Sequence, residues 1–366
     1  MTATIDITDT GADAFAERVF EASLGFVDVM SITLGDQLGW YDALAERGAL
    51  TAGALAEATG SDSRYALEWL EQQATTGILT VDDPARPAAE RRYTLPDGHR
   101  EVLTDRDSVA FLAPLARLFA GTGVQLPALL DAYRTGGGVS WAQYGPLVRT
   151  GQAEMNRPFF VSELPTQWFP AVPEVHARLQ AGALVADVGC GEGWSAIGMA
   201  LAYPQVRVDA FDIDEPSIVA ARAHAEAAGV ADRVRFVCTD LAALDGSQAG
   251  AYDVVTAFEC VHDVPAPVPF LQAMRRLVAD DGHVIVMDER VAEQCSGRPD
   301  DVERLMYGFS VLLCLPDGRS HAPSAATGTV MRPGTLLEHA RAAGFADLEV
   351  LPIDNDLWRF YRLTTG

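Results

Sequence analysis

The sequence contains no lysine, so arginine supplies all of its permanent positive charge. This absence excludes two kinds of chemistry that need a lysine amine, namely Schiff-base catalysis and a phosphate-binding loop of the P-loop type. The basic residues number 27 against 51 aspartates and glutamates, which gives a net charge of −24. Such an excess of negative charge argues against nucleic acid and against anionic membrane surfaces as partners.

Cysteine is scarce as well, and apolar runs are short. The five cysteines form no Cys-x-x-Cys pair, and no tight spacing of His, Asp or Glu resembles a ligand set, so we expect neither a disulfide framework nor a metal. No apolar run reaches the roughly 18–20 residues of a membrane span, and no basic and apolar leader is visible. We therefore expect a cytoplasmic protein with no membrane partner.

At 366 residues, of which 49% are apolar, the chain is long enough for more than one domain. Residues 1–104 form the first expected domain, because apolar side chains recur there at helical spacing. We expect helices at 13–27, 32–41, 50–60 and 64–75, and two strands at 77–81 and 92–95. A helix–turn–helix followed by two strands is a winged-helix pattern.

A winged helix is compatible with two different functions. It can bind DNA through its second helix, here 64–75, or it can serve as a dimerisation domain. Arg64 in that helix is accompanied by the acidic Glu68 and Glu71, whereas a DNA reader needs Arg, Lys, Asn or Gln toward bases and phosphates. The charges therefore favour a homodimer, and a ligand-responsive DNA-binding regulator stays the alternative.

The segment 184–202 combines an apolar β-type run, three alternating glycines and a helix-forming run. Gly189, Gly191 and Gly193 suit a turn in which the backbone takes positive φ or a ligand approaches the main chain. The helix that follows offers free N–H groups to such a ligand. Trp194 occupies the place of the third glycine in a dinucleotide fingerprint, which argues against a pyrophosphate at this turn.

Two acids beside this turn indicate a ligand that has a positive charge and a ribose but no phosphate. Asp187 directly precedes the glycines, where its negative charge would repel a phosphate. Asp212 ends the next expected strand, 19 positions after Gly193 (212 − 193), at a distance typical of an acid that binds ribose hydroxyls. We therefore expect S-adenosylmethionine as the cofactor, with S-adenosylhomocysteine as its product.

The order of motifs resembles the class I S-adenosylmethionine-dependent methyltransferases. The glycine turn resembles their first motif, and later motifs follow at 211–214, 235–241, 252–259 and 277–286. Residues 50–60 resemble a region of plant and bacterial O-methyltransferases that carry an N-terminal winged-helix dimerisation domain. The resemblance implies a Rossmann-like α/β domain at 171–366, with an insertion at 290–330 and a last strand that is antiparallel. The strands are expected near 184–188, 206–211, 234–238, 252–258, 283–288, 346–351 and 357–363.

The resemblance also implies which residues hold the cofactor. Asp187 and the glycine turn would hold the methionine part, with the Asp187 carboxylate near the amino group. Asp212 would take both ribose hydroxyls. The remaining contacts would come from Ile213 on the adenine face, Asp240 and Leu241 at the adenine edge, and Phe258 near the methyl-bearing sulfur.

A histidine follows the fourth expected strand and is a candidate general base. His262 lies in the segment Glu259-Cys-Val-His-Asp263, which resembles the His-Asp motif of plant-type O-methyltransferases. The resemblance implies that Asp288, at the end of the fifth strand, orients this histidine. Val264 departs from the plant pattern, which has a tryptophan there, and the same His-Asp pair caps a helix in methyltransferases that need no base. Both roles of His262 therefore stay open.

Residues 105–170 are expected to be a helical connector rich in aromatic residues, suited to a substrate lid or to a core between domains. The candidate substrate contacts are Tyr144, Asn156, Phe160 and Glu163, together with Tyr307 in the insertion. We predict a methyltransferase that acts on a small molecule in secondary metabolism. A protein that uses S-adenosylmethionine for other chemistry is the first alternative, and the residues leave open whether the methyl group goes to oxygen, nitrogen, carbon or sulfur.

Overall fold

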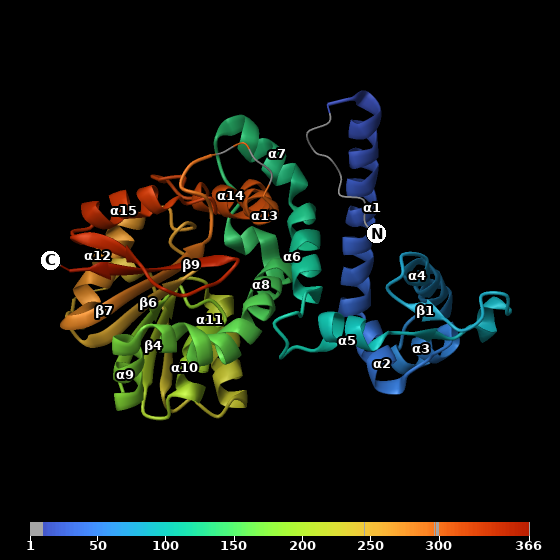
Figure 1. The fold of residues 1–366 in the computed structure, drawn as a ribbon, viewed down its shortest axis with the longest axis horizontal. Helices are drawn as coiled ribbons and strands as arrows, with labels where there is room; N and C mark the ends of the chain where they lie inside the picture. Colours follow the sequence, from blue (N-terminus) through green and yellow to red (C-terminus); the bar gives the residue numbers. More distant parts are fainter. Residues whose placement is uncertain (1–9, 245, 296, 298–299, 366) are drawn as a thin grey trace. The chain divides into compact units, whose positions relative to one another are not determined.

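The computed structural model describes residues 10–244, 246–295, 297 and 300–365, and their contacts divide the chain into two units (Figure 1). The N-terminal unit comprises Met1–Gly123 and Pro146–Pro158. The sheet unit comprises Val124–Gly145 and Phe159–Gly366. The connector expected at 105–170 therefore does not stand as a unit of its own, because its segments pack alternately with one unit and with the other.

The N-terminal unit contains the expected winged helix. Its elements are α1 (Ala12–Gln37), α2 (Trp40–Arg47), α3 (Ala52–Thr59), α4 (Ser63–Thr75), β1 (Thr80–Val81), η1 (Ala88–Glu90), β2 (Tyr93–Thr94), α5 (Asp97–Thr104) and α6 (Ala113–Val124). The strands β1 and β2 pair antiparallel, and Asp62 caps α4 by accepting the N–H of Arg64 and Tyr65. The two helices and the antiparallel strands confirm the predicted winged-helix pattern.

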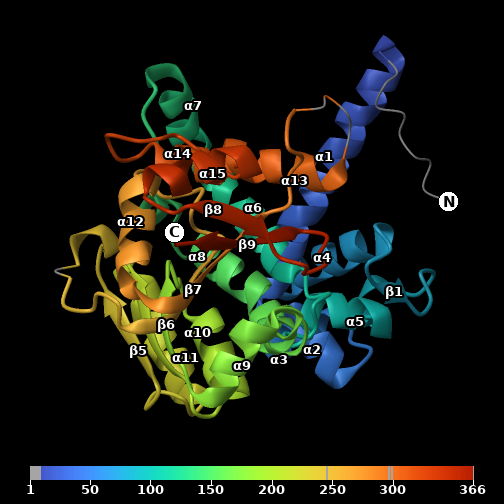
Figure 2. The same ribbon diagram turned by 60° about the vertical axis from the view of Figure 1, so that its left-hand side comes forward.

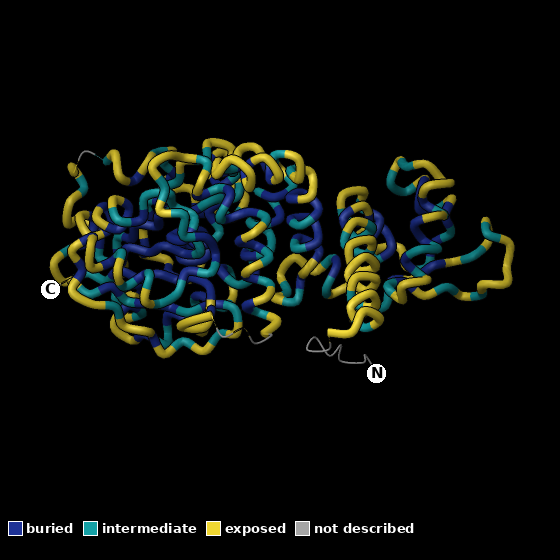
Figure 3. The backbone as a smooth tube through the Cα atoms, turned by 90° about the horizontal axis from the view of Figure 1, so that it is seen from above, coloured by how far each residue is buried: buried dark blue, intermediate teal, exposed yellow. Residues whose placement is uncertain are grey.

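The predicted break between helices at 27 and 32 is wrong. The helix α1 runs without interruption over 26 residues, because 28–31 contain neither glycine nor proline. The turn comes instead at Gly39, whose φ of 66° lies in the left-handed region that favours glycine. Figure 3 shows most of α1 exposed, and the apolar side chains on it include Phe15, Phe20 and Phe26, which are 58%, 62% and 60% exposed.

A buried ion pair stabilises the N-terminal unit. The Arg117 guanidinium of α6 donates from Nε and Nη2 to the Asp36 carboxylate of α1, at 2.9 and 3.2 Å. It also donates to Glu154 at 3.0 Å and to the Thr150 hydroxyl at 3.2 Å. Glu154 and Thr150 lie on α8 (Trp141–Pro158), which is kinked at Gly145, the boundary between the units. The side chains of Arg117 and Asp36 are only 5% and 7% exposed, so water stabilises neither charge and each ion needs the other as its partner.

The second unit is built on a seven-stranded sheet in the order β5-β4-β3-β6-β7-β9-β8. All strands are parallel except β9, which is antiparallel to β7 and β8, as Figure 2 shows. The strands are β3 (Leu184–Val188), β4 (Arg207–Asp212), β5 (Val234–Cys238), β6 (Tyr252–Phe258), β7 (Val278–Glu289), β8 (Asp347–Val350) and β9 (Trp358–Thr364). This arrangement confirms the predicted fold class, including the antiparallel last strand.

Two buried apolar clusters cover the two faces of the sheet. One cluster joins the sheet to α9 (Pro173–Ala181), α10 (Trp194–Ala202), α11 (Glu215–Ala227) and η2 (Phe159–Trp168). The other joins it to α12 (Pro267–Leu277) and α15 (Pro333–Ala342). The central strands β3 and β6 are thus buried on both faces, which explains their mostly apolar sequences.

Two helical segments of this unit lie outside the alternating pattern of strands and helices. The first is α7 (Leu126–Thr135) with the π-helix η2, which packs against α10. The second fills the expected insertion with α13 (Asp301–Phe309), the π-helix η5 (Ser310–Cys314) and α14 (Leu315–Gly318). The short 3-10 helices η3 (Phe169–Ala171) and η4 (Leu241–Ala243) complete the unit.

Candidate active site at the carboxyl ends of the parallel strands

The glycine turn between β3 and α10 has the backbone that its sequence predicts. Gly189, Gly191 and Gly193 have φ of 69°, 51° and 84°, which residues with a Cβ rarely adopt. A Cβ on Gly189 would lie 2.6 Å from Cys260 Sγ, and one on Gly193 would lie 2.6 Å from the Phe236 ring. A Cβ on Gly191 would meet nothing within 4 Å, so at this position the turn faces open space.

Asp187 of β3 lies directly before the turn and bonds to side chains of α10 and β6. Its carboxylate is only 1% exposed and accepts hydrogen bonds from Ser195 Oγ at 2.5 Å and Thr256 Oγ1 at 2.7 Å. Burial raises the pKa of Asp187 to about 6, although both hydroxyls favour the ionised form. Both oxygens are therefore engaged inside the protein, and the expected contact with an amino group of the cofactor stays a prediction.

Asp212 holds the turn from the neighbouring strand. Its Oδ2 accepts the N–H of Gly191 at 2.8 Å, and its Oδ1 accepts the N–H of Asp214 at 2.9 Å. Burial raises the pKa of this carboxyl, and the backbone N–H groups oppose that shift. Each carboxylate oxygen can accept a second hydrogen bond, so both oxygens can still take the hydroxyls of a ribose.

The other expected cofactor residues lie along the same edge of the sheet. Ile213 is 64% exposed directly after Asp212, as an apolar platform for a flat ring requires. Asp240 follows β5 and accepts the N–H of Ala242 at 2.9 Å, so it caps η4, while Leu241 is buried in the core. Phe258 ends β6, and its ring centroid lies 5.5 Å from that of Phe160.

These residues fit an adenosyl ligand that carries a positive charge and no phosphate. The turn is open where Gly191 lacks a side chain, a half-buried carboxylate stands at the expected ribose position, and an exposed aliphatic side chain follows it. Trp194 does not obstruct the turn, because its ring stacks on His224 of α11 with centroids 4.5 Å apart. When bound there, S-adenosylmethionine would supply an electrophilic methyl group on its sulfonium.

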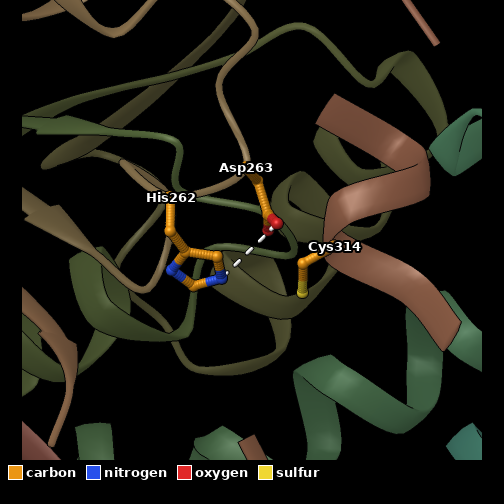
Figure 4. Close-up of side chains that lie close together, drawn as sticks. All are labelled: His262, Asp263 and Cys314. Carbon is orange, nitrogen blue, oxygen red and sulfur yellow. Dashed lines mark ion pairs between the residues drawn. The ribbon is translucent and has the colours of Figure 1, made fainter. Parts of the chain in front are cut away.

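His262 and Asp288, the predicted catalytic pair, lie together at the ends of β6 and β7. His262 Nδ1 is 2.9 Å from Asp288 Oδ1, which confirms the expected proximity of these two side chains. On the other side of the ring, His262 Nε2 is 3.4 Å from Asp263 Oδ1, and Cys314 of η5 approaches the same atoms (Figure 4). The histidine is only 3% exposed.

The electrostatics of His262 follow from these neighbours. Burial disfavours the charged ring, but the carboxylates of Asp263 and Asp288 outweigh burial and raise the pKa of His262 well above its usual value. Burial also raises the pKa of Asp263, against the opposing effect of His262. The two carboxylates therefore favour the doubly protonated ring, and a ring in that form cannot accept another proton. The role of His262 as a base stays a prediction.

A second pair of acids, which the sequence did not indicate, lies beside this cluster. Glu259 has a φ of 50°, a strained value for a residue with a side chain, and its Oε1 accepts the Trp358 indole N–H at 2.6 Å. Glu289 is 6% exposed, and burial followed by the nearby Glu259 raises its pKa well above the usual range. Burial and the neighbouring Glu259 thus favour the protonated form of Glu289.

The expected substrate residues are dispersed. The Tyr144 hydroxyl donates to the Leu312 carbonyl at 2.7 Å, and the Tyr307 hydroxyl accepts from Arg332 at 3.2 Å, so both are engaged with partners in the protein. Phe160 is buried against Phe258 and Trp168. Glu163 is half-buried on η2, and Asn156 is buried in the N-terminal unit.

Two residues of the site were missed as functional candidates. Asp263 follows His262 directly and was read only as part of the motif, and Cys314 lies 52 positions farther along the chain (314 − 262). The His-Asp dipeptide could have indicated Asp263. Nothing in the sequence around Cys314 indicates that its thiol lies beside the histidine.

Comparisons with known proteins agree with this geometry. Residues 185–282 match the family model "Methyltransferase domain", and residues 26–105 match the "Rv2258c-like winged HTH domain". The chain is similar to the ubiquinone biosynthesis O-methyltransferase of Azotobacter vinelandii, at 31% identity over 193 residues that cover 52% of this chain and 77% of the relative. For the corresponding enzyme of Psychrobacter arcticus the identity is 35% over 184 residues, covering 50% of this chain and 67% of the relative.

Solved structures extend the likeness to nearly the whole chain. The mitomycin 7-O-methyltransferase MmcR has a TM-score of 0.72 at 22% identity and covers 98% of this chain and 100% of its own. Human N-acetylserotonin methyltransferase in complex with SAM has a TM-score of 0.71 at 17% identity, covering 98% and 99%. At such identities the likeness concerns the fold. Among the described residues, no helix is both long and apolar enough to cross a membrane.

Proposed function

We propose that this chain, which belongs to the class I S-adenosylmethionine-dependent methyltransferases, transfers the methyl group of that cofactor to a hydroxyl oxygen of a small organic molecule. The observation that carries the proposal is the position of two groups of residues on one edge of the sheet. The cofactor residues lie at or just after the ends of β3, β4 and β6, and His262 and Asp288 lie at the ends of β6 and β7. An open α/β sheet binds its ligands at this edge.

In such a reaction the protein mainly orients the two reactants, because the sulfonium cofactor is already a strong electrophile. Displacement at a sulfonium methyl needs an acceptor oxygen held in line with the methyl group, and alignment of this kind supplies several kcal/mol of catalysis. The turn at 189–193 and Asp212 fix one reactant. Phe258 at the end of β6 packs on Phe160, which packs on Trp168, so an aromatic or otherwise apolar acceptor beside the cofactor would meet the edge of a buried aromatic cluster.

We favour oxygen as the methyl acceptor because a buried cluster of titratable side chains lies at the strand ends, where an acceptor hydroxyl would have to lose its proton. A hydroxyl becomes a good nucleophile only when its proton is removed or its oxygen is polarised. His262, Asp263 and Asp288 are three of the titratable groups at the carboxyl ends of β6 and β7, where Glu259 and Glu289 also lie. The relatives from Azotobacter and Psychrobacter are also named as O-methyltransferases.

We also propose that the chain acts as a homodimer through α1. This helix exposes apolar side chains along its length, and the described part of its own unit does not cover them. The helix α4, which would read DNA in a regulator, has Arg64 paired with Glu68 on its exposed side. A molar mass near 78 kDa, about twice the 39.2 kDa chain, is expected from light scattering. A monomer at micromolar concentration would contradict the dimer.

The cofactor assignment is tested by calorimetric titration with S-adenosylmethionine and S-adenosylhomocysteine. Charged hydrogen bonds are worth about 1.5–3 kcal/mol each, so Asp212→Ala should raise the dissociation constant at least tenfold. Asp347→Ala is the matched control, because Asp347 is exposed at the far edge of the sheet. Unchanged affinity in Asp212→Ala would refute the ribose contact.

The reaction itself is tested by the formation of S-adenosylhomocysteine with a panel of hydroxylated aromatic acceptors, run beside amine and thiol analogues. Turnover confined to the hydroxyl compounds is the expected result. Turnover with the amine or thiol analogues alone would reject oxygen as the acceptor. Formation of other products from S-adenosylmethionine would support the alternative chemistry considered above.

A further inference from the structure

Three metal-binding side chains converge at the carboxyl end of β6. His262 and Asp263 lie in the loop after this strand, and Cys314 is the last residue of η5 in the insertion. His262 Nε2, an Asp263 oxygen and Cys314 Sγ all lie within 4.8 Å of one another (Figure 4). Within the described parts of the chain, this is the single group of His, Cys, Asp and Glu side chains with such spacing.

The distances suit a shared metal better than a hydrogen bond. His262 Nε2 and Asp263 Oδ1 are 3.4 Å apart, beyond the usual 2.7–3.2 Å of an N–H···O bond. Asp263 Oδ1 is also buried without a hydrogen-bond partner among the described residues. Nitrogen and oxygen bound to one tetrahedral zinc, at about 2.0–2.1 Å each, lie about 3.3 Å apart.

We propose that His262, Asp263 and Cys314 bind a zinc ion, an inference that deepens the function proposed above. A thiolate, an imidazole and a carboxylate form a ligand set that favours Zn²⁺ over Mg²⁺ or Ca²⁺, which prefer oxygen alone. Binding replaces the thiol proton of Cys314 and the Nε2 proton of His262, and both protons go to solvent. The two anionic ligands then balance the charge of the metal.

The surroundings of the three side chains are those of a prepared metal site. Asp288 Oδ1 lies 2.9 Å from His262 Nδ1, the carboxylate–histidine arrangement that orients metal-binding imidazoles. The insertion is fixed around the same loop, because Gly328 N–H donates to the His262 carbonyl at 3.2 Å and Ala325 N–H donates to the Pro265 carbonyl at 2.8 Å. The ion would thus join the insertion to the sheet.

Three protein ligands leave one position of a tetrahedral zinc for an oxygen from solvent or from the acceptor, as in catalytic zinc sites. Zinc lowers the pKa of a bound oxygen acid and would make the acceptor hydroxyl nucleophilic near neutral pH. In this arrangement His262 is a metal ligand, and polarisation by the ion replaces the general-base role predicted for it.

The test is a zinc titration of the chelator-treated full chain against a chromophoric competitor, followed by substitution with Co²⁺. We expect one metal ion per chain and a thiolate-to-cobalt absorption band. Cys314→Ser and Asp263→Asn should each weaken zinc binding at least tenfold, and only Cys314→Ser should abolish the band. The matched control is Cys295→Ser, because Cys295 is exposed and lies outside the cluster, and its zinc affinity should equal that of the unaltered chain.

Calorimetric titration with S-adenosylmethionine checks that each variant is folded. The proposal is overturned if the unaltered chain takes up no zinc, or if folded Cys314→Ser and Asp263→Asn bind zinc as tightly as it does. Methyl transfer to hydroxyl acceptors by a zinc-free chain would also overturn it and leave the proposed function intact. Stoichiometric zinc binding without any methyl transfer would instead support the site and reject the proposed function.

Discussion

The glycine turn allows two effects of a Cβ atom to be measured separately. Gly189 and Gly191 both have left-handed backbone, with φ of 69° and 51°. Alanine in this conformation costs about 1–2 kcal/mol relative to glycine. A Cβ at Gly191 meets nothing within 4 Å, so Gly191→Ala should lower the free energy of unfolding by that backbone cost alone.

Gly189→Ala adds a steric conflict to the same backbone cost. The new Cβ would lie 2.6 Å from Cys260 Sγ and 2.7 Å from Cys260 Cβ, well inside contact distance. Because overpacking typically costs a further 1–3 kcal/mol, we expect a total loss of about 2–5 kcal/mol. The excess over Gly191→Ala should largely disappear when Cys260 is replaced by glycine in the same chain.

Urea denaturation of the cofactor-free protein, followed by circular dichroism, measures these differences. The unaltered chain, Gly189→Ala, Cys260→Gly and the variant with both changes form a double-mutant cycle, in which residues in contact usually couple by about 0.5–3 kcal/mol. Equal destabilisation by Gly189→Ala and Gly191→Ala, or no coupling with Cys260→Gly, would refute the steric argument. For cofactor affinity we expect the reverse order. Calorimetry should show a larger loss of S-adenosylmethionine affinity in Gly191→Ala than in Gly189→Ala, because the alanine methyl group at position 191 would point into the open space of the turn.

Two further predictions concern buried charges. Arg117→Met should destabilise the chain by about 3–5 kcal/mol, because it leaves Asp36 buried without its cation, and Arg117→Met with Asp36→Asn should recover much of that loss in urea denaturation. Asp317 is a half-buried carboxyl that accepts the Trp141 backbone N–H at 2.7 Å, and desolvation raises its pKa to about 7. Its raised pKa means that the folded state binds the proton more tightly than the unfolded state, so stability is lost as pH rises from about 4 to 7. Asp317→Asn should therefore melt at a higher temperature than the unaltered chain at pH 8, by a margin that shrinks at pH 5, and a margin independent of pH would reject this account.

Much of the sheet unit could be predicted because its local patterns and its tertiary arrangement agree. The strands β3, β5 and β6 have the bounds expected from the sequence. β3 and β6 are buried on both faces, whereas β5, at the edge of the sheet, exposes Arg235 on one face. The strand β7 starts at Val278, five positions before the expected 283 (283 − 278). The segment Asp280-Asp-Gly282 resembles a turn, and its pairing with β6 is irregular near Tyr252 and Val254.

The active-site edge was only partly predictable. His262 and Asp288 follow adjacent parallel strands, so their meeting follows from the topology. The partners of Tyr144 and Cys314 come from segments far away in the chain, Leu312 for the former and His262 for the latter. Helical periodicity gives no information on which helix of an insertion lies over the sheet, and these contacts therefore required the structure.

The helix pair α10 and η2 limits how the sequence can change. At Gly198 the two backbones approach so closely that a Cβ would lie 2.1 Å from the Phe160 carbonyl oxygen, whereas at Gly53 or Gly123 it would meet nothing within 4 Å. A random library at Gly198 should return only glycine, while libraries at Gly53 and Gly123 should accept many residues. Phe160 of η2 contacts Phe258 at the end of β6. A directed-evolution experiment that aims to change which acceptors are methylated would therefore have to vary side chains on η2 while the distance between η2 and α10 stays fixed.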